Sequence, residues 1–269
     1  MRITCFQGPE KPDTPQGNLD LLARVASTAR GKGAELLIVP ELFLTGYAIG
    51  ATEVARLAEP LGGVALTVVA GIAKANGLAI IVGFPEMSEG AVYNAAAAFD
   101  AQGQLLACYR KTHLFGDLDK GQFSACAEPP QLFDIGGFKV GMLICYDVEF
   151  PENTRALALL GADLVVVPTA LMRPFDVVAN ILVPARAYEN QVYMAYVDRC
   201  GTEADFEYCG LSCVVGPDGT DLARAGRGEE LIVADIDLSA LRQSRQINTH
   251  IQDRRPALYR RLTERKQNQ

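Results

Sequence analysis

The sequence predicts an α/β domain built on a mixed sheet, and three observations lead to that class. Short runs rich in valine, isoleucine and leucine recur along the 269 residues. Helical patterns lie between several of these runs, which is typical of layered α/β proteins. The turn sequences at 100–103 and 216–219 each separate two strand-like runs and indicate hairpins, so part of the sheet is expected to be antiparallel.

The apolar runs are expected to form strands buried on both faces, because many of them are almost continuously apolar. Ten runs meet this description: Arg2–Gly8, Leu36–Pro40, Ala79–Phe84, Tyr93–Phe99, Leu105–Tyr109, Phe138–Cys145, Leu164–Val167, Val192–Asp198, Cys213–Gly216 and Glu230–Asp235.

The first helix is expected to be capped by Asn18 and to end near Gly31 and Gly33. Its apolar residues recur at intervals of three and four, which places them on one face. They are Leu19, Leu22, Val25, Ala26 and Ala29. Further helical segments are expected at Glu53–Ala58, Ala65–Asn76, Glu152–Leu160, Asp176–Asn190 and around Pro256–Glu264.

Composition excludes several classes of protein. Lys+Arg is 25 and Asp+Glu is 32, so the net charge is −7, and no binding to nucleic acid is expected. The longest uncharged run, Pro60–Ala73, has 14 residues, short of the roughly 20 apolar residues that a membrane span needs. No linker or shift in composition divides the chain, so a single domain is expected over residues 1–269.

The cysteines and histidines bear on location and on metals. Seven cysteines are scattered along the chain without a CxxC pair, which favours free thiols in a reducing compartment and therefore a cytoplasmic protein. Only His113 and His250 are available as imidazole ligands, so a zinc site built on several histidines is not expected.

Cys145 is the candidate nucleophile. It ends a predicted strand and precedes a polar, charged segment that opens a helix. Backbone N–H groups and the positive helix end at such a turn favour the thiolate. The alternative is an ordinary buried cysteine.

Two residues could serve Cys145 as a base. His113 would form a Cys–His pair, although a lone histidine is more often structural. Glu41 directly follows a very apolar strand, where partial burial would raise its pKa and suit it to accept a thiol proton. Glu41 could equally be an exposed loop residue. Lys111, next to a predicted strand end, could stabilise an oxyanion or be an ordinary surface lysine.

The chain contains one internal similarity. Gly33–Glu41 closely matches Gly161–Thr169, each being a helix end followed by a buried strand that proline stops. This is either a common α/β junction or the trace of two related halves facing each other. Two related halves would place Glu41 and Thr169 at equivalent strand ends.

Three segments together resemble the signature blocks of the nitrilase superfamily of carbon–nitrogen hydrolases. They are Pro40–Tyr47, Tyr109–Phe115 and Cys145–Glu152, and they occur in the family's order at similar separations. The resemblance covers nearly the whole chain. It implies a four-layer α-β-β-α sandwich and a homodimer or higher homo-oligomer, with the C-terminal segment (about 240–269) packing on a partner subunit. It implies no cofactor.

The resemblance also implies residue roles. Matching motifs make Glu41 the general base, Lys111 an oxyanion stabiliser, Cys145 the nucleophile and the Tyr146 N–H a second oxyanion donor. Asp119 stands where the family often has a second glutamate, and Ala125-Cys126 replaces the usual Pro-Gly of the following turn. Tyr47, Glu149 and Thr169 are expected to contribute to substrate binding.

Within this superfamily the Cys145 block is most similar to bacterial aliphatic amidases. The resemblance therefore implies hydrolysis of a small aliphatic carboxamide, with or without an amino group, through a cysteine thioester. Three nearby carboxylates, Glu203, Asp205 and Glu207, could attract a substrate ammonium or form a solvated acidic loop. The alternatives are a nitrilase or an N-carbamoyl amine hydrolase on the same catalytic frame, or a catalytically silent binding protein.

Overall fold

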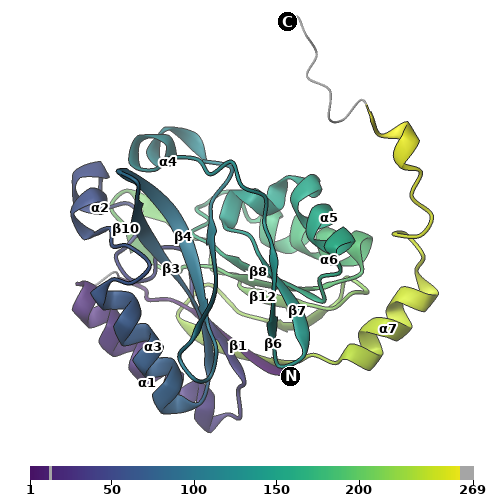
Figure 1. Ribbon diagram of the computed structural model, residues 1–269, viewed down its shortest axis with the longest axis horizontal. Helices are drawn as coiled ribbons and strands as arrows, with labels where there is room; N and C mark the ends of the chain where they lie inside the picture. The colour runs from purple at the N-terminus through teal and green to yellow at the C-terminus, as the bar shows by residue number, and fades with distance from the viewer. Residues whose placement is uncertain (12–13, 261–269) are drawn as a thin grey trace, which may run out of the picture.

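The computed structural model describes residues 1–11 and 14–260 and has four layers (Figure 1). Two six-stranded sheets pack face to face, and helices cover the outer face of each. The predicted α-β-β-α sandwich is therefore confirmed.

The first sheet has the strand order β14-β1-β2-β3-β4-β5. The central strands β1, β2 and β3 are parallel, and the outer strands pair antiparallel. The bounds are β14 (Glu230–Asp235), β1 (Arg2–Gln7), β2 (Leu36–Ile38), β3 (Ala79–Ser88), β4 (Ala91–Phe99) and β5 (Leu105–Arg110).

The second sheet, ordered β13-β12-β9-β8-β7-β6, repeats this pattern. Three parallel strands, β7, β8 and β9, are again flanked by antiparallel ones. The bounds are β13 (Asp221–Arg224), β12 (Cys213–Val215), β9 (Tyr193–Val197), β8 (Leu164–Pro168), β7 (Phe138–Met142) and β6 (Leu132–Ile135). Glu41 follows β2 and Thr169 follows β8, the middle parallel strand of each sheet, as the interpretation of two related halves requires.

Two pairs of helices form the outer layers. Helices α1 (Pro15–Gly31) and α3 (Val64–Asn76) cover the first sheet, whereas α5 (Pro151–Leu160) and α6 (Val183–Asn190) cover the second (Figure 1). The remaining elements are α2 (Ala51–Leu57), α4 (Gly116–Gln122), α7 (Leu238–Ile247), the 3-10 turns η1 (Cys145–Glu149) and η3 (Pro256–Leu258), the π turn η2 (Val178–Leu182), and the short hairpin of β10 (Thr202–Glu203) and β11 (Phe206–Glu207).

Successive side chains along a strand point to opposite faces of the sheet, so the first sheet contributes to two apolar layers. Ile38 and Ile81 face the second sheet and join a core that includes Val166. Leu37 and Val82 face the other way and pack against α1 and α3. Burial on both faces explains why the central strands are continuously apolar in sequence.

All ten predicted strands are present, but the prediction for Phe138–Cys145 was too long. The strand β7 ends at Met142, because the chain leaves the sheet there although Leu143 and Ile144 remain buried. Strands β6, β10, β11 and β13 and helices α4 and α7 were not predicted. β13 carries Asp221 and Arg224 at its ends, and α7 buries only Leu241, so neither has a strong apolar pattern.

The predicted cap of the first helix was wrong. Thr14 is the N-cap and accepts a hydrogen bond from Gly17 N–H, and Pro15 occupies the first turn, where a missing N–H is tolerated. Asn18 instead lies inside the helix, where it is buried and donates to the carbonyl of Leu44. It thereby ties α1 to the loop that follows Glu41.

Two helix predictions need further correction. Residues 176–190 do not form one α-helix, because the π turn η2 precedes α6. Pro184 lacks the N–H that an uninterrupted α-helix would use. Of the helix expected around Pro256–Glu264, only η3 is present, and residues 261–264 lie outside the described residues.

The helices within residues 1–11 and 14–260 were also compared with what a membrane span requires. None of them has both the length and the apolar character needed to cross a bilayer.

Candidate active site

The three principal candidates converge from three strand ends. Glu41 follows β2, Lys111 follows β5 and Cys145 follows β7. Glu41 and Lys111 are inaccessible to solvent, and Cys145 is 8% exposed. The sandwich therefore brings together, in a nearly dry environment, residues that are far apart in sequence.

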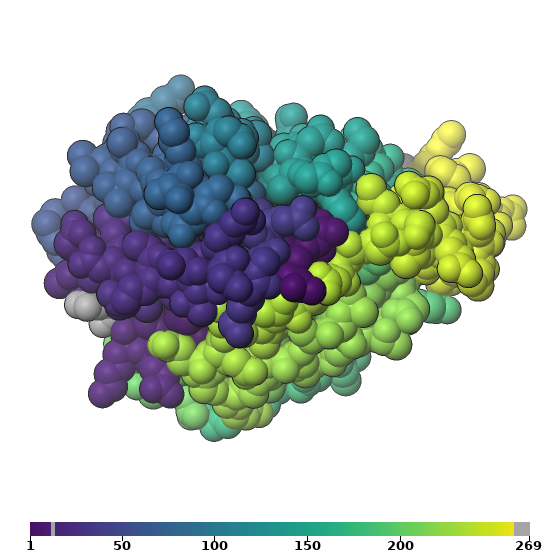
Figure 2. All heavy atoms as spheres, turned by 90° about the horizontal axis from the view of Figure 1, so that it is seen from below, coloured from purple at the N-terminus to yellow at the C-terminus, as the bar shows by residue number. Residues whose placement is uncertain are grey.

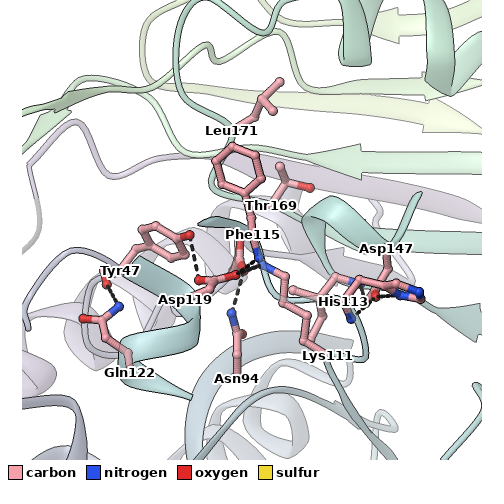
Figure 3. Close-up of polar contacts among 12 residues, drawn as sticks. Tyr47, Asn94, Lys111, His113, Phe115, Asp119, Gln122, Asp147, Thr169 and Leu171 are labelled. Carbon is pink, nitrogen blue, oxygen red and sulfur yellow. Dashed lines mark hydrogen bonds and ion pairs between the residues drawn. The ribbon is translucent and has the colours of Figure 1, made fainter. Parts of the chain in front are cut away.

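Lys111 is held between two carboxylates, those of Glu41 and Asp119; Figure 3 labels Lys111 and Asp119. Its Nζ lies 2.8 Å from Glu41 Oε1 and 2.7 Å from Asp119 Oδ2. All three side chains are fully buried, so these ion pairs are only weakly screened by solvent. Burial lowers the pKa of Lys111, but the neighbouring anions outweigh it and raise that pKa well above its usual value. The two carboxylates therefore favour the charged form of Lys111.

Asp119 is fixed by three donors. Besides Lys111, the Tyr47 hydroxyl donates to its Oδ1 at 2.7 Å, and the Phe115 N–H donates to its Oδ2 at 3.0 Å. Asp119 lies on α4, which brings its short side chain to Lys111. An aspartate thus reaches the position where the resemblance implies a glutamate.

The two oxygens of Glu41 differ. Oε1 accepts from Lys111 and from Asn94 Nδ2 at 2.6 Å, whereas Oε2 has no hydrogen-bond partner among the described residues. Burial raises the pKa of Glu41, and the Asp119 carboxylate adds to this, while Lys111 and Asn94 act in the opposite direction. A buried carboxylate with a raised pKa and an unused oxygen is suited to accept a proton.

The close approach of the Glu41 turn to the sheet depends on Gly83 in β3. A Cβ at residue 83 would lie 2.4 Å from the backbone nitrogen of Leu42 and 2.7 Å from the carbonyl oxygen of Pro40. Any other residue at this position would force the turn, and Glu41 with it, away from the sheet.

Cys145 stands at a strained turn between strand and helix. Its φ of 48° is in the left-handed region, which a residue with a Cβ rarely adopts outside functional or tightly determined sites. Burial raises the pKa of the thiol well above its usual value, and Glu41 raises it further, while Lys111 and the Ala170 N–H oppose the shift. Burial thus opposes the expected preference for the thiolate, which favours a mechanism in which a base removes the thiol proton.

Asp147 determines the shape of this turn. Its carboxylate accepts hydrogen bonds from the Ile144 N–H, the Tyr109 hydroxyl and the Thr112 hydroxyl. The ring of His113 also lies against it, with Nδ1 2.9 Å from Asp147 Oδ1. His113 thus belongs to the support of the turn, and no hydrogen bond between it and Cys145 occurs among the described residues.

The other predicted site residues surround this centre. Tyr146 is the second residue of η1, among the N–H groups that a helix start leaves for external acceptors. Tyr47 bonds to Asp119, and Glu149 ends η1, half-buried. Thr169 is buried, and its hydroxyl donates to the carbonyl of Val167. The backbone N–H of the next residue, Ala170, contacts the Cys145 sulfur.

The three carboxylates of the predicted acidic loop are not equivalent. Glu203 is buried and accepts hydrogen bonds, and Glu207 pairs with Arg173 at 2.8 Å. Asp205 remains exposed. Two of the three charges are thus already compensated, which argues against the predicted attraction of a substrate ammonium by this loop.

Three contributors were missed: Asn94, Asp147 and Arg199. Asn94 comes just before four consecutive alanines in a largely buried strand, and Arg199 lies two residues after the end of the apolar strand β9. A polar residue in such a setting is costly unless it has partners, so both were detectable signals. Asp147 gives no comparable signal, because acidic residues at helix starts are common.

Within residues 1–11 and 14–260, no group of three or more His, Cys, Asp or Glu side chains is arranged to hold a metal ion.

Comparison with known proteins agrees with this geometry. The carbon–nitrogen hydrolase family model matches residues 2–246. A protein of Pseudomonas protegens described as a hydrolase in the pqqF 5′ region is 49% identical, covering 98% of this chain and 93% of its own. An (R)-stereoselective amidase of a Pseudomonas species is 36% identical, covering 95% of this chain and 92% of its own.

A solved structure is similar over the same length. The amidase of Nesterenkonia sp. AN1 superposes with a TM-score of 0.84 and 37% identity, covering 97% of this chain and 99% of that one. A mutant of that amidase carries the acetamide moiety of fluoroacetamide covalently on its active-site cysteine. Its structure gives the same TM-score and identity, and the match covers 97% of this chain and 96% of that one.

The chain belongs to the carbon–nitrogen hydrolase family. The predicted family and class of enzyme are confirmed: it is a hydrolase that acts on amide carbon–nitrogen bonds.

The pH dependence of Cys145 reactivity is expected to report on Glu41. The hydrogen bond from Asn94 lowers the pKa of Glu41, so Asn94→Leu is expected to raise that pKa. The pH below which the rate of Cys145 alkylation falls is then expected to rise by about one unit. The measurement is the rate of alkylation by iodoacetamide, followed by mass spectrometry across pH. Asn76→Leu, on the outer helix α3, serves as the control. An unchanged limb in a folded Asn94→Leu protein would contradict the expectation.

Proposed function

We propose that this hydrolase cleaves small aliphatic carboxamides to the acid and ammonia, with Cys145, Glu41 and Lys111 as catalytic residues. The observation that carries the proposal is the buried Lys111 between two carboxylates, one of which keeps an oxygen unused. Cysteine, base and fixed cation are the parts that acyl transfer through a thioester needs.

The reaction proceeds in two steps. Glu41 Oε2 takes the Cys145 proton as sulfur attacks the amide carbon, and it returns that proton to the leaving nitrogen as ammonia departs. Water then attacks the thioester with Glu41 again as base, and the Cys145 thiol is restored.

The oxyanion of each tetrahedral intermediate is stabilised by Lys111 and the Tyr146 N–H. Asp119, itself fixed by the Tyr47 hydroxyl, holds the ammonium of Lys111 in place, so the positive charge needs no rearrangement as the oxyanion forms.

The substrate chain is placed by the residues around the nucleophile. Phe115, Tyr146 and Phe175 form an aromatic wall, with ring centroids 5.2 Å and 5.8 Å apart, and Phe175 is 41% exposed. In a 3-10 turn residues three apart share a face, so Glu149 lies on the same side as Tyr146. We place the amino group of an amino-bearing amide against Glu149.

The first experiment measures ammonia release from pentanamide, 5-aminopentanamide, pentanenitrile and an N-carbamoyl amine. Turnover is expected for the two amides alone and is abolished in Cys145→Ala. Turnover confined to the nitrile or the carbamoyl amine would overturn the substrate class, and turnover that survives Cys145→Ala would overturn the nucleophile.

Glu149→Gln separates the cationic amide from the neutral one. Burial raises the pKa of Glu149, while Arg186 and Lys111 lower it. Loss of its charge is expected to reduce kcat/KM for 5-aminopentanamide about 10- to 100-fold relative to pentanamide. Glu207→Gln, the same change at the exposed pair with Arg173, is the matched control. Equal effects on both amides would show that Glu149 does not recognise the amino group.

We further propose a homodimer formed through α5, α6 and the C-terminal segment, as far as residue 260. Leu159, Leu160 and Tyr188 are 48%, 60% and 47% exposed on these helices, beside a hollow of about 900 Å³. Figure 2 shows the C-terminal segment, in yellow, at one end of the molecule. Exposed apolar side chains on neighbouring helices are typical of a subunit interface.

Light scattering is expected to give twice the 29.0 kDa chain mass, and Leu159→Glu combined with Leu160→Glu to shift the protein toward the monomer. A monomeric wild type would rule the interface out.

The catalytic unit is proposed to be one domain, in a reducing, cytoplasmic setting. All seven cysteines are free thiols, and such a complement is stable where disulfides do not form.

A further inference from the structure

Arg199 is a fully buried cation whose hydrogen bonds go to the Glu41 turn. Its Nη1 donates to the main-chain oxygens of Glu41, at 3.1 Å, and Leu42, at 3.3 Å. Nε and Nη2 have no hydrogen-bond partner among the described residues, and the nearest carboxylate oxygen, Glu203 Oε2, lies 3.8 Å from Nε. A buried ion pair with unused donors is a poor source of stability. The structural effect of Arg199 is to fix the turn through its hydrogen bonds to these two carbonyl oxygens.

Glu203 is fixed at the other end of the same turn. Its Oε1 accepts from the Tyr47 N–H at 2.9 Å, and its Oε2 accepts from the Tyr208 hydroxyl at 2.5 Å. A Cβ on Gly46 would lie 2.5 Å from Glu203 Oε1, and Gly46 has a φ of +98°. Only glycine leaves room for this carboxylate in that backbone conformation.

We propose that Arg199 and Glu203 form a positioning clamp that holds both ends of the turn between Glu41 and Tyr47 and so fixes the Glu41 carboxylate for proton transfer. This inference rests on the role proposed for Glu41. Arg199 holds the first end through two carbonyls, and Glu203 holds the last through the Tyr47 N–H.

The network closes into a ring through the catalytic cluster. Tyr47, held by Glu203 through its N–H, donates through its hydroxyl to Asp119. Asp119 pairs with Lys111, and Lys111 pairs with the side chain of Glu41. The clamp therefore acts on both carboxylates that flank Lys111.

The backbone of the turn needs such support. Leu42 has a φ of 49°, a left-handed conformation that is unfavourable for a residue with a branched side chain and persists only where its surroundings impose it. The hydrogen bond from Arg199 to its carbonyl supplies part of that constraint. If the bond is lost, relaxation of Leu42 moves the adjacent Glu41.

The test uses two variants. Glu203→Gln keeps an acceptor for the Tyr47 N–H but removes the negative charge that faces Arg199. Arg199→Lys keeps the positive charge but loses the planar guanidinium group. Tyr208→Phe, which removes a single hydrogen bond to Glu203, is the milder third variant should the others fail to fold. Glu207→Gln and Arg173→Lys repeat the first two changes at the exposed pair next to the clamp.

Each variant is checked for folding by its melting temperature, and kcat, KM and the rate of Cys145 alkylation are then measured at one pH. Glu203→Gln and Arg199→Lys are expected to lower kcat and the alkylation rate about 10- to 100-fold, as for a small displacement of a catalytic group, with KM within about threefold. A smaller loss of the same kind is expected for Tyr208→Phe. The two controls are expected to match the wild type.

Folded variants with unchanged kcat and alkylation, or a loss confined to KM, would overturn the clamp. A wild type that hydrolyses no amide, but whose Cys145 alkylation still slows in Glu203→Gln, would instead overturn the proposed function and leave the clamp standing.

Discussion

The structure of the site depends on burying one cation between two anions. Lys111 has no access to solvent and neither do Glu41 and Asp119, so each charge is tolerable only because the others are within hydrogen-bond distance. Removal of Lys111 would leave two uncompensated anions in a medium of low dielectric constant, and removal of either carboxylate would leave Lys111 with a single anionic partner. This mutual dependence keeps the three side chains in one arrangement and gives the Lys111 ammonium a fixed direction.

Around this cluster, neighbouring residues fix the turns that carry Glu41 and Cys145 at the ends of their strands. Gly83 lets the Glu41 turn approach the first sheet, and Asp147 closes the turn at Cys145 in the second. Arg199 and Glu203 constrain the Glu41 turn from farther away, because their hydrogen bonds are to the backbone of the turn and not to the reacting atoms. Strained backbone at Leu42 and Cys145 faces the same centre from opposite sheets, which is where strain is expected if the surroundings determine the site.

Burial also decides the protonation state of the nucleophile. A cysteine at a helix start is expected to ionise easily, yet here desolvation and the nearby Glu41 outweigh Lys111 and the Ala170 N–H. Burial therefore favours the thiol form, in keeping with the proposal that a base removes its proton as sulfur attacks. The same low dielectric that suppresses the free thiolate strengthens the interaction of Lys111 with a developing oxyanion.

The sequence by itself determined the class of fold and the principal candidates, because continuous apolar runs and local motifs are properties of short segments. It predicted ten of the twelve strands of the two six-stranded sheets, and it singled out Glu41, Lys111, Cys145 and Asp119. It did not reveal that His113 supports a turn, that Glu203 is buried, or that Asn94 and Arg199 contact Glu41. These facts depend on contacts between residues up to 158 positions apart, and on the balance of burial against charge. Only the packing of the two sheets establishes those contacts, so only the tertiary structure decided them.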